Sequence, residues 1–116
     1  MKNNEVLTAL YKAFNARDVD AVLAMLTPDV DWPNGWEGGR LTGHEAVRDY
    51  WDRQWVEIDP HVDPTSITSR PDGEVEVRVH QVVHDRHGTL LGDDEILHIY
   101  TFQGSLIRRM VIAKRD

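Results

Sequence analysis

Residues 74–85, EVEVRVHQVVHD, decide the fold, because valine alternates with polar residues along most of this stretch. β-Branched residues at a period of two predict a half-buried strand. The turn signals PDG at residues 71–73 and RHG at residues 86–88 flank it, so neighbouring strands are expected on both sides. Those strands are predicted over residues 67–70, 95–102 and 106–113, which together form a meander.

The first third of the chain has the apolar spacing of helices. Apolar residues recur three and four positions apart and predict a helix over residues 3–16. Asp18 is the expected N-cap of a second, short helix, which Pro28 ends because proline cannot donate to the helical ladder. The buried stripe of this second helix is expected to be Val19, Val22, Leu23 and Leu26.

A short strand at residues 29–32 is expected to precede a third helix. Thr42 and Glu45 have the spacing of a capping box, in which two side chains satisfy amides at a helix start. This helix would end before Pro60 and bury Trp51 and its apolar neighbours. Helices gathered on one side of an antiparallel sheet predict an α+β fold, here as one domain over residues 1–116.

Composition excludes several classes of function. The chain has 116 residues and no cysteine, so disulfide scaffolds, thiolate metal sites and a cysteine nucleophile are ruled out. A net charge of −7 disfavours nucleic acid and anionic membranes as partners. No apolar run approaches the about 20 residues of a membrane helix, and we expect a cytoplasmic protein.

Three segments carry a resemblance to a known family. They are FNARDVD at residues 14–20, LTGHEAVRDYW at residues 41–51, and HIYTF at residues 98–102 with the following Gly104 and LIRR at residues 106–109. The chain resembles the SnoaL-like branch of the nuclear transport factor 2-like, or ketosteroid isomerase-like, superfamily. This superfamily includes steroid isomerases, polyketide cyclases, epoxide hydrolases, dehydratases and members without a known activity.

The resemblance implies a fold, a partner and a ligand class. The fold would be a cone-shaped α+β barrel of the cystatin-like type, with three helices packed on a curved, mainly antiparallel sheet. Its open pocket would take a small hydrophobic, oxygenated molecule without a cofactor, and its outer sheet face would form a homodimer. The shared fold does not settle the activity.

Compared position by position with the steroid isomerases, this chain lacks the central group. Those enzymes combine a carboxylate base with an oxyanion hole made of a tyrosine and a protonated aspartic acid. The base falls at about Asn34, whose amide cannot accept the proton. The acidic oxyanion-hole residue falls at His98, and the tyrosine of the first helix falls near Tyr11. The isomerase mechanism therefore does not transfer unchanged.

His98 and His80 are the predicted catalytic pair. Imidazoles titrate near neutrality, so two of them facing one cavity supply an acid and a base, and the resemblance implies a dehydratase-like elimination of water. Alternation would place His80 inward together with Arg78, Val82 and His84, leaving the valines outside. Either a second subunit on the outer face or a register-reversing bulge resolves that conflict. The alternative is that each histidine is an inert core residue.

Other residues are expected to contact the ligand or to position it. Arg109 is expected to face inward with Ile107 and Val111, where it needs a carboxylate partner or an anionic ligand. Trp36 lies among glycines and is expected to act as a lid or to fix the loop. The full predicted binding set is Tyr11, Trp32, Asn34, Trp36, Trp55, Tyr100 and Arg109.

No metal site is expected, because histidines four apart on a strand do not converge as they do on a helix. The absence of a glycine-rich phosphate motif argues against a nucleotide cofactor. Three hypotheses remain open. They are a histidine-dependent lyase, isomerase or cyclase, a ligand-binding module without chemistry, and a dimeric interaction domain.

Overall fold

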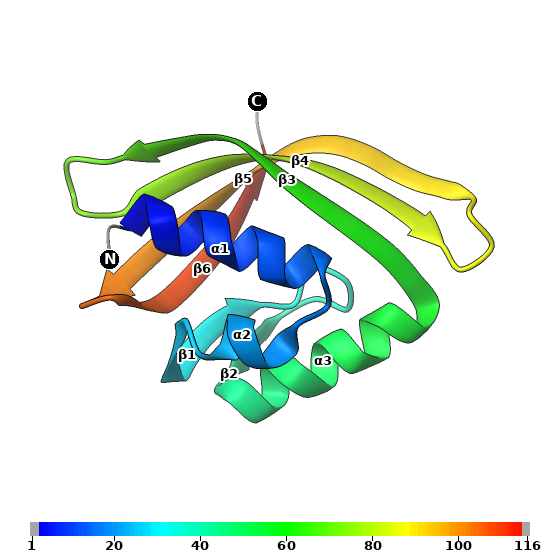
Figure 1. Cartoon of the computed structure of the whole chain (residues 1–116), viewed down its shortest axis with the longest axis horizontal. Helices are drawn as coiled ribbons and strands as arrows, with labels where there is room; N and C mark the ends of the chain where they lie inside the picture. The colour runs from blue at the N-terminus through cyan, green and yellow to red at the C-terminus, as the bar shows by residue number, and fades with distance from the viewer. Residues whose placement is uncertain (1–2, 115–116) are drawn as a thin grey trace.

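The computed structural model describes residues 3–114, which form helices on one side of a curved mixed sheet (Figure 1). The elements are α1 (Asn3–Asn15), α2 (Val19–Leu23), β1 (Leu26–Pro33), β2 (Arg40–Thr42), α3 (His44–Glu57), β3 (Ile58–Ser69), β4 (Val75–Asp85), β5 (Leu90–Gln103) and β6 (Leu106–Lys114). The six strands lie in the order β2-β1-β6-β5-β4-β3. Strands β1 and β6 are parallel, so the expected α+β class is confirmed with a mixed sheet in place of a mainly antiparallel one.

The meander of β3 to β6 is confirmed, but β3 is much longer than predicted. It runs for 12 residues and passes through Pro60 and Pro64, whereas the strand had been predicted only over residues 67–70. β3 lies at the edge of the sheet, where a proline need not donate to a second neighbour. The long strand forms the arch seen over α1 in Figure 1.

Two predicted helix boundaries are wrong for local reasons. α2 ends at Leu23, and Leu26 opens β1 instead of closing the helical stripe. The capping box does not form, because the N-cap of α3 is Gly43, whose φ of 89° suits glycine and which has no side chain to cap with. Asp18 does cap α2, since its carboxylate accepts the amide of Ala21 at 3.2 Å.

The valines Val75, Val77 and Val79 form the inner face of β4, whereas the sequence predicted that they would face outward. Val77 pairs directly with His98 on β5, and directly paired residues of antiparallel strands point to the same side. The register shifts near the hairpin, where Val83 pairs with Gly92 but His84 pairs with Leu90. The extra residue of this bulge changes which residues face inward. The valines therefore pack on the helices, and no second subunit is needed to cover them.

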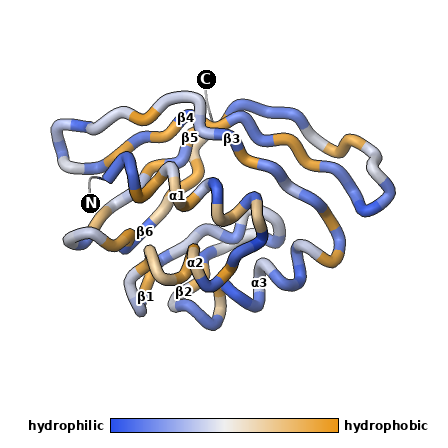
Figure 2. Tube along the Cα trace, viewed as in Figure 1, coloured by the Kyte–Doolittle hydropathy of each residue, from blue (hydrophilic) through white to orange (hydrophobic). Residues whose placement is uncertain are grey.

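The core fills the space between α1, α3 and the inner sheet face. Figure 2 shows apolar and hydrophilic residues interspersed along the long strands. The fully buried side chains include Leu7, Val22, Leu26, Val30, Val47, Val77, Val79, Tyr100 and Ile107. None of the helices between residues 3 and 114 is long and apolar enough to span a membrane.

Candidate functional site

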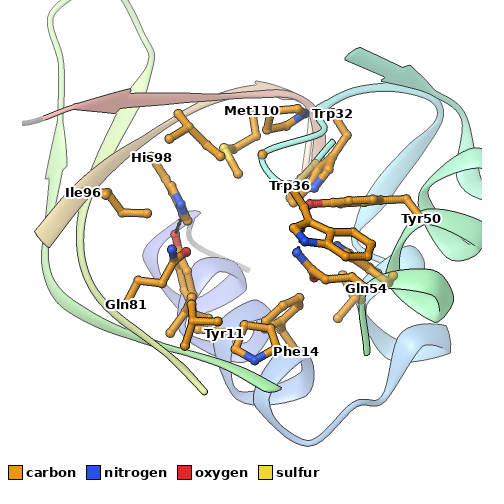
Figure 3. A pocket seen from close by; sticks show the side chains of 18 of the residues that line it. Tyr11, Phe14, Trp32, Trp36, Tyr50, Gln54, Gln81, Ile96, His98 and Met110 are labelled. Carbon is orange, nitrogen blue, oxygen red and sulfur yellow. Dashed lines mark hydrogen bonds between the residues drawn. The ribbon is translucent and has the colours of Figure 1, made fainter. Parts of the chain in front are cut away.

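A cavity of about 630 Å³ lies between the inner sheet face and the helices (Figure 3). Its volume is in the range of small-molecule sites. Most of its wall is apolar or aromatic. The apolar lining includes Leu10, Phe14, Val22, Trp32, Trp51, Val62, Val83, Ile96 and Met110.

A chain of three polar side chains crosses the wall between α1 and β5. The Tyr11 hydroxyl lies 2.7 Å from Nδ1 of His98 and 2.7 Å from the Tyr100 hydroxyl. All three residues are buried, with exposed fractions of 3% for Tyr11, 6% for His98 and 1% for Tyr100. His98 and Tyr100 are two residues apart on β5, so they point to the same side and meet one tyrosine from α1.

Burial keeps this chain uncharged. Desolvation lowers the pKa of His98 to about 4, so the imidazole is neutral at pH 7. The pKa values of the Tyr11 and Tyr100 phenols are raised, again mainly because burial disfavours their charged forms. The chain therefore consists of three neutral hydrogen-bonding groups.

The hydrogen bonds favour one direction along the chain. Tyr100 has no other side-chain partner among the described residues, so its hydroxyl is satisfied when it donates to Tyr11. Tyr11 then donates to Nδ1 of His98, which leaves the proton of the neutral ring on Nε2. Nε2 has no partner among the described residues, and the ring lines the cavity. His98 thus presents an N–H donor to the interior.

His98 lines the cavity, and so do four of the predicted binding residues. Tyr11, Trp32 and Tyr100 are part of its wall, as expected. Trp36 lines it from the loop after β1 and is 39% exposed, so its ring lies between the interior and solvent. Four other predicted site residues lie elsewhere.

His80 lies on the opposite face of the sheet, and the prediction that it shares the cavity with His98 is wrong. Its Nε2 lies 2.6 Å from a carboxylate oxygen of Asp93, and both side chains are about half exposed. The hydrogen bond with Asp93 raises the pKa of His80. The reason is the bulge at Leu91, the residue of β5 left between the Val83–Gly92 and His84–Leu90 pairs. This bulge pairs His80 with Glu95, so the His80 side chain points outward.

Asn34 shapes a turn instead of facing the ligand site. Its Oδ1 accepts the amide of Glu37 at 2.7 Å, and its Nδ2 donates to the Glu37 carboxylate at 2.9 Å. Both ends of the side-chain amide are therefore occupied, and Asn34 is not part of the cavity wall. The expectation that it binds substrate is wrong, because the side chain organises the loop that carries Trp36.

Trp55 and Arg109 are also outside the cavity wall. Trp55 stacks on Trp51 at a centroid distance of 5.9 Å and lies behind it, with the Arg17 guanidinium over its ring. The pairing of β5 with β6 shifts by one residue beside Arg109, since Thr101 pairs with Arg109 but Phe102 pairs with Ile107. The Arg109 side chain therefore points outward and is half exposed. The expectation that it faces inward is wrong. Its partner is the carboxylate of Asp31, at a distance of 3.5 Å.

Three uncharged polar residues of the wall were not among the predicted site residues. Gln81 is on the inner face of β4, which sequence alternation had turned the other way. Tyr50 and Gln54 lie one turn apart on α3, and Gln54 Nε2 donates to the Tyr50 hydroxyl oxygen at 3.1 Å. A glutamine on an otherwise apolar helix face was the available signal. Figure 3 places Tyr50, Gln54 and Trp36 across the cavity from His98 and Gln81.

The histidines and carboxylates of residues 3–114 do not form a metal site. Between residues 3 and 114, no three such side chains converge in a way that could hold an ion. The carboxylates of the chain are also missing from the described cavity wall, and the one charged residue there is Arg40. Arg40 already contacts the Asp31 carboxylate at 2.8 Å and the Met110 carbonyl oxygen at 2.8 Å.

Comparisons with known proteins agree with this architecture. The family model of the SnoaL-like domain matches residues 7–110. Among curated proteins, no sequence matches the chain. Solved structures with similar folds are numerous, and the three described next are less than 25% identical to this chain, so they are evidence for the fold alone.

Three of these structures span almost the whole chain. An NTF2-like protein of unknown function from Burkholderia pseudomallei has a TM-score of 0.85 at 23% identity, covering 99% of this chain and 92% of its own. TerC, co-crystallised with polyporic acid, has a TM-score of 0.84 at 24% identity, covering 97% and 91%. A proposed polyketide cyclase from Xanthomonas campestris pv. campestris has a TM-score of 0.78 at 24% identity, covering 97% and 90%.

Proposed function

Because the chain belongs to the SnoaL-like domain family, we propose that its cavity binds a small hydrophobic molecule and acts on one of its oxygens. The reaction class would be that of a lyase, isomerase or cyclase without a cofactor. The observation that carries this proposal is the Tyr100–Tyr11–His98 chain, with two contacts of 2.7 Å inside an apolar cavity. The polyporic acid bound to TerC and the proposed polyketide cyclase from Xanthomonas campestris are consistent with an oxygenated ligand.

His98 would act as a neutral hydrogen-bond donor. A substrate carbonyl placed against Nε2–H would be polarised, and negative charge developing on its oxygen would be stabilised in a site that excludes water. Neutral imidazole performs this role in other enzymes when its pKa is lowered. Tyr11 and Tyr100 resist ionisation, so the chain favours donation to an oxyanion over complete transfer of a proton.

The alternative is a binding module that performs no chemistry. The observation in its favour is that the described cavity wall contains no carboxylate base beside His98. Part of the proposal is also a homodimer through the outer sheet face, where Leu97 and Ile99 lie half-buried between charged residues. Analytical ultracentrifugation measures that assembly independently of any ligand.

A melting-shift experiment with aromatic ketones and phenols tests the binding step. Ligands that bind only the native state raise the melting temperature. We expect 4-phenylphenol and 2-tetralone to raise it for the natural protein and for His80→Gln, but far less for His98→Gln. The two variants make the same substitution on opposite faces of the sheet. An equal shift in all three proteins would contradict the assignment of His98.

Exchange of the α-hydrogens of 2-tetralone in D₂O separates an enzyme from a binding module. Polarisation of the carbonyl lowers the barrier to enolisation, in which a solvent water accepts the α-proton while Nε2–H of His98 stabilises the enolate oxygen. The natural protein should therefore exchange these hydrogens about 10²-fold faster than His98→Gln. Mass spectrometry of the recovered ketone gives the rate. Binding of 2-tetralone without faster exchange would favour the module.

Trp36→Ala is expected to weaken ligand binding with little effect on folding. The ring covers the cavity from an exposed loop, so its loss opens the site to water and removes apolar contact. We expect the affinity for 4-phenylphenol to fall about tenfold through faster dissociation, with a stability change within about 0.5 kcal/mol. Stopped-flow fluorescence gives the dissociation rate. An unchanged rate would mean that Trp36 only fixes the loop.

A further inference from the structure

The wall opposite His98 carries a second polar pair that the proposed reaction does not use. Tyr50 is 4% exposed, and its hydroxyl oxygen accepts the Gln54 amide at 3.1 Å. The backbone amides of Gly35 and Trp36 also interact with this oxygen and lower the Tyr50 pKa, while burial, the largest influence, raises it. The Tyr50 oxygen is therefore surrounded by donors, and the phenol stays protonated.

This pair leaves one donor and one acceptor without a protein partner. The Tyr50 hydroxyl oxygen accepts hydrogen bonds, so its own hydrogen is available, and no acceptor for it occurs among the described residues. Gln54 uses its Nε2 in the same hydrogen bond, and its Oε1 has no partner among residues 3–114. Both residues line the cavity. Both groups face the cavity, where only water or a ligand can pair with them, so a ligand that supplies a matching acceptor and donor is favoured.

The space between the two polar sites is apolar. Phe14 and Trp32 line it from α1 and β1, and Met110 lines it from β6 (Figure 3). Arg40, the one charged residue of the described wall, is already paired with Asp31. An ionic group in the middle of the ligand would therefore be desolvated without compensation.

We propose that the cavity selects a neutral, largely apolar molecule with an oxygen at each end, one held by His98 and the other by the Tyr50–Gln54 pair. This inference rests on the proposed function, because it takes His98 as the first anchor. A ligand with only one oxygen would leave one of the two polar sites unpaired. Tyr50 and Gln54 would then determine which molecules bind, without taking part in the chemistry at His98.

Matched phenols and diols test the second anchor. Binding of 2-naphthol is compared with that of 2,6-dihydroxynaphthalene, and 4-phenylphenol with 4,4′-dihydroxybiphenyl, by isothermal titration calorimetry. Two lengths are used because the second oxygen must reach the second site. In the natural protein, at least one diol should bind about tenfold more tightly than its matched phenol.

Gln54→Leu should remove that tenfold advantage, so that in this variant neither diol binds more tightly than its matched phenol. Tyr50→Phe provides a second route to the same result if Gln54→Leu does not fold. Gln103→Leu, at the exposed end of β5, is the control and should keep the advantage. The proposal is overturned if neither diol gains over its phenol, or if the gain persists in both Gln54→Leu and Tyr50→Phe.

Failure of the proposed function has a different signature. In that case the phenols bind the natural protein and His98→Gln equally well, or bind neither. Failure of the second anchor alone leaves the phenols dependent on His98 while the diols gain nothing.

Discussion

Acidification from pH 7 to pH 4 is expected to cost this protein about 3 kcal/mol of folding free energy through His98 alone. Burial lowers the pKa of His98 from 6.5 to about 4 in the folded state. Below pH 6.5 the unfolded chain binds a proton at this position, and the folded chain does not until the pH nears 4. The contribution of the neutral His98 to the folding free energy is therefore fully present above pH 6.5 and is lost as the pH falls toward 4.

Urea unfolding at pH 7.5, 6, 5 and 4.5 measures this loss. His98→Gln removes the titrating group and should flatten the pH dependence by most of that amount. His80→Gln is the control, since the pKa of His80 is raised by Asp93 and its exposed ring affects stability weakly and in the opposite direction. A profile for His98→Gln as steep as that of the natural protein would contradict the buried, neutral imidazole.

Tyr11→Phe is expected to destabilise the protein by about 2–4 kcal/mol, and Tyr100→Phe by only about 1 kcal/mol. The Tyr11 hydroxyl is the central group of the chain, so its removal leaves both Nδ1 of His98 and the Tyr100 hydroxyl unpaired. Removing the Tyr100 hydroxyl leaves the Tyr11–His98 hydrogen bond in place. Chemical unfolding of both variants at pH 7 gives the two values.

The double variant Tyr11→Phe with Tyr100→Phe checks the same arrangement. It leaves only Nδ1 of His98 unpaired, so it should cost less than the sum of the single variants. Equal costs for the two single variants, or strict additivity in the double variant, would contradict a chain with Tyr11 at its centre.

The fold was predictable where local pattern and tertiary packing agree. The valine alternation of residues 74–85 and the apolar spacing of α1 both predicted the elements that form. Only the end of β3 was predicted, and its first part, residues 58–66, was missed. That part contains Pro60 and Pro64, which an edge strand accepts. The parallel pairing of β1 with β6 joins the two ends of the chain, and no local pattern reports such a contact.

The site was predictable only in part, and single-residue bulges explain most of the errors. Alternation shows that every second side chain of a strand faces inward, but it does not show which of the two sets does so. The bulge near Leu91 decides this for β4, where Gln81 faces inward and His80 faces outward. The shift beside Arg109 had the same effect on β6. The family resemblance pointed to Tyr11 and His98, both of which line the cavity. It matches positions along the sequence and so does not depend on the register of the strands.

The central claim is that a neutral imidazole of His98 faces the cavity and meets the ligand's oxygen. Nitrogen-15 NMR of the histidine-labelled protein, with and without 4-phenylphenol at pH 7, tests it most directly. We predict that His98 has the shifts of a neutral ring protonated on Nε2, and that the Nε2 signal moves when the phenol binds. A charged His98 ring, or an Nε2 signal unchanged by a phenol shown to be bound, would contradict the account.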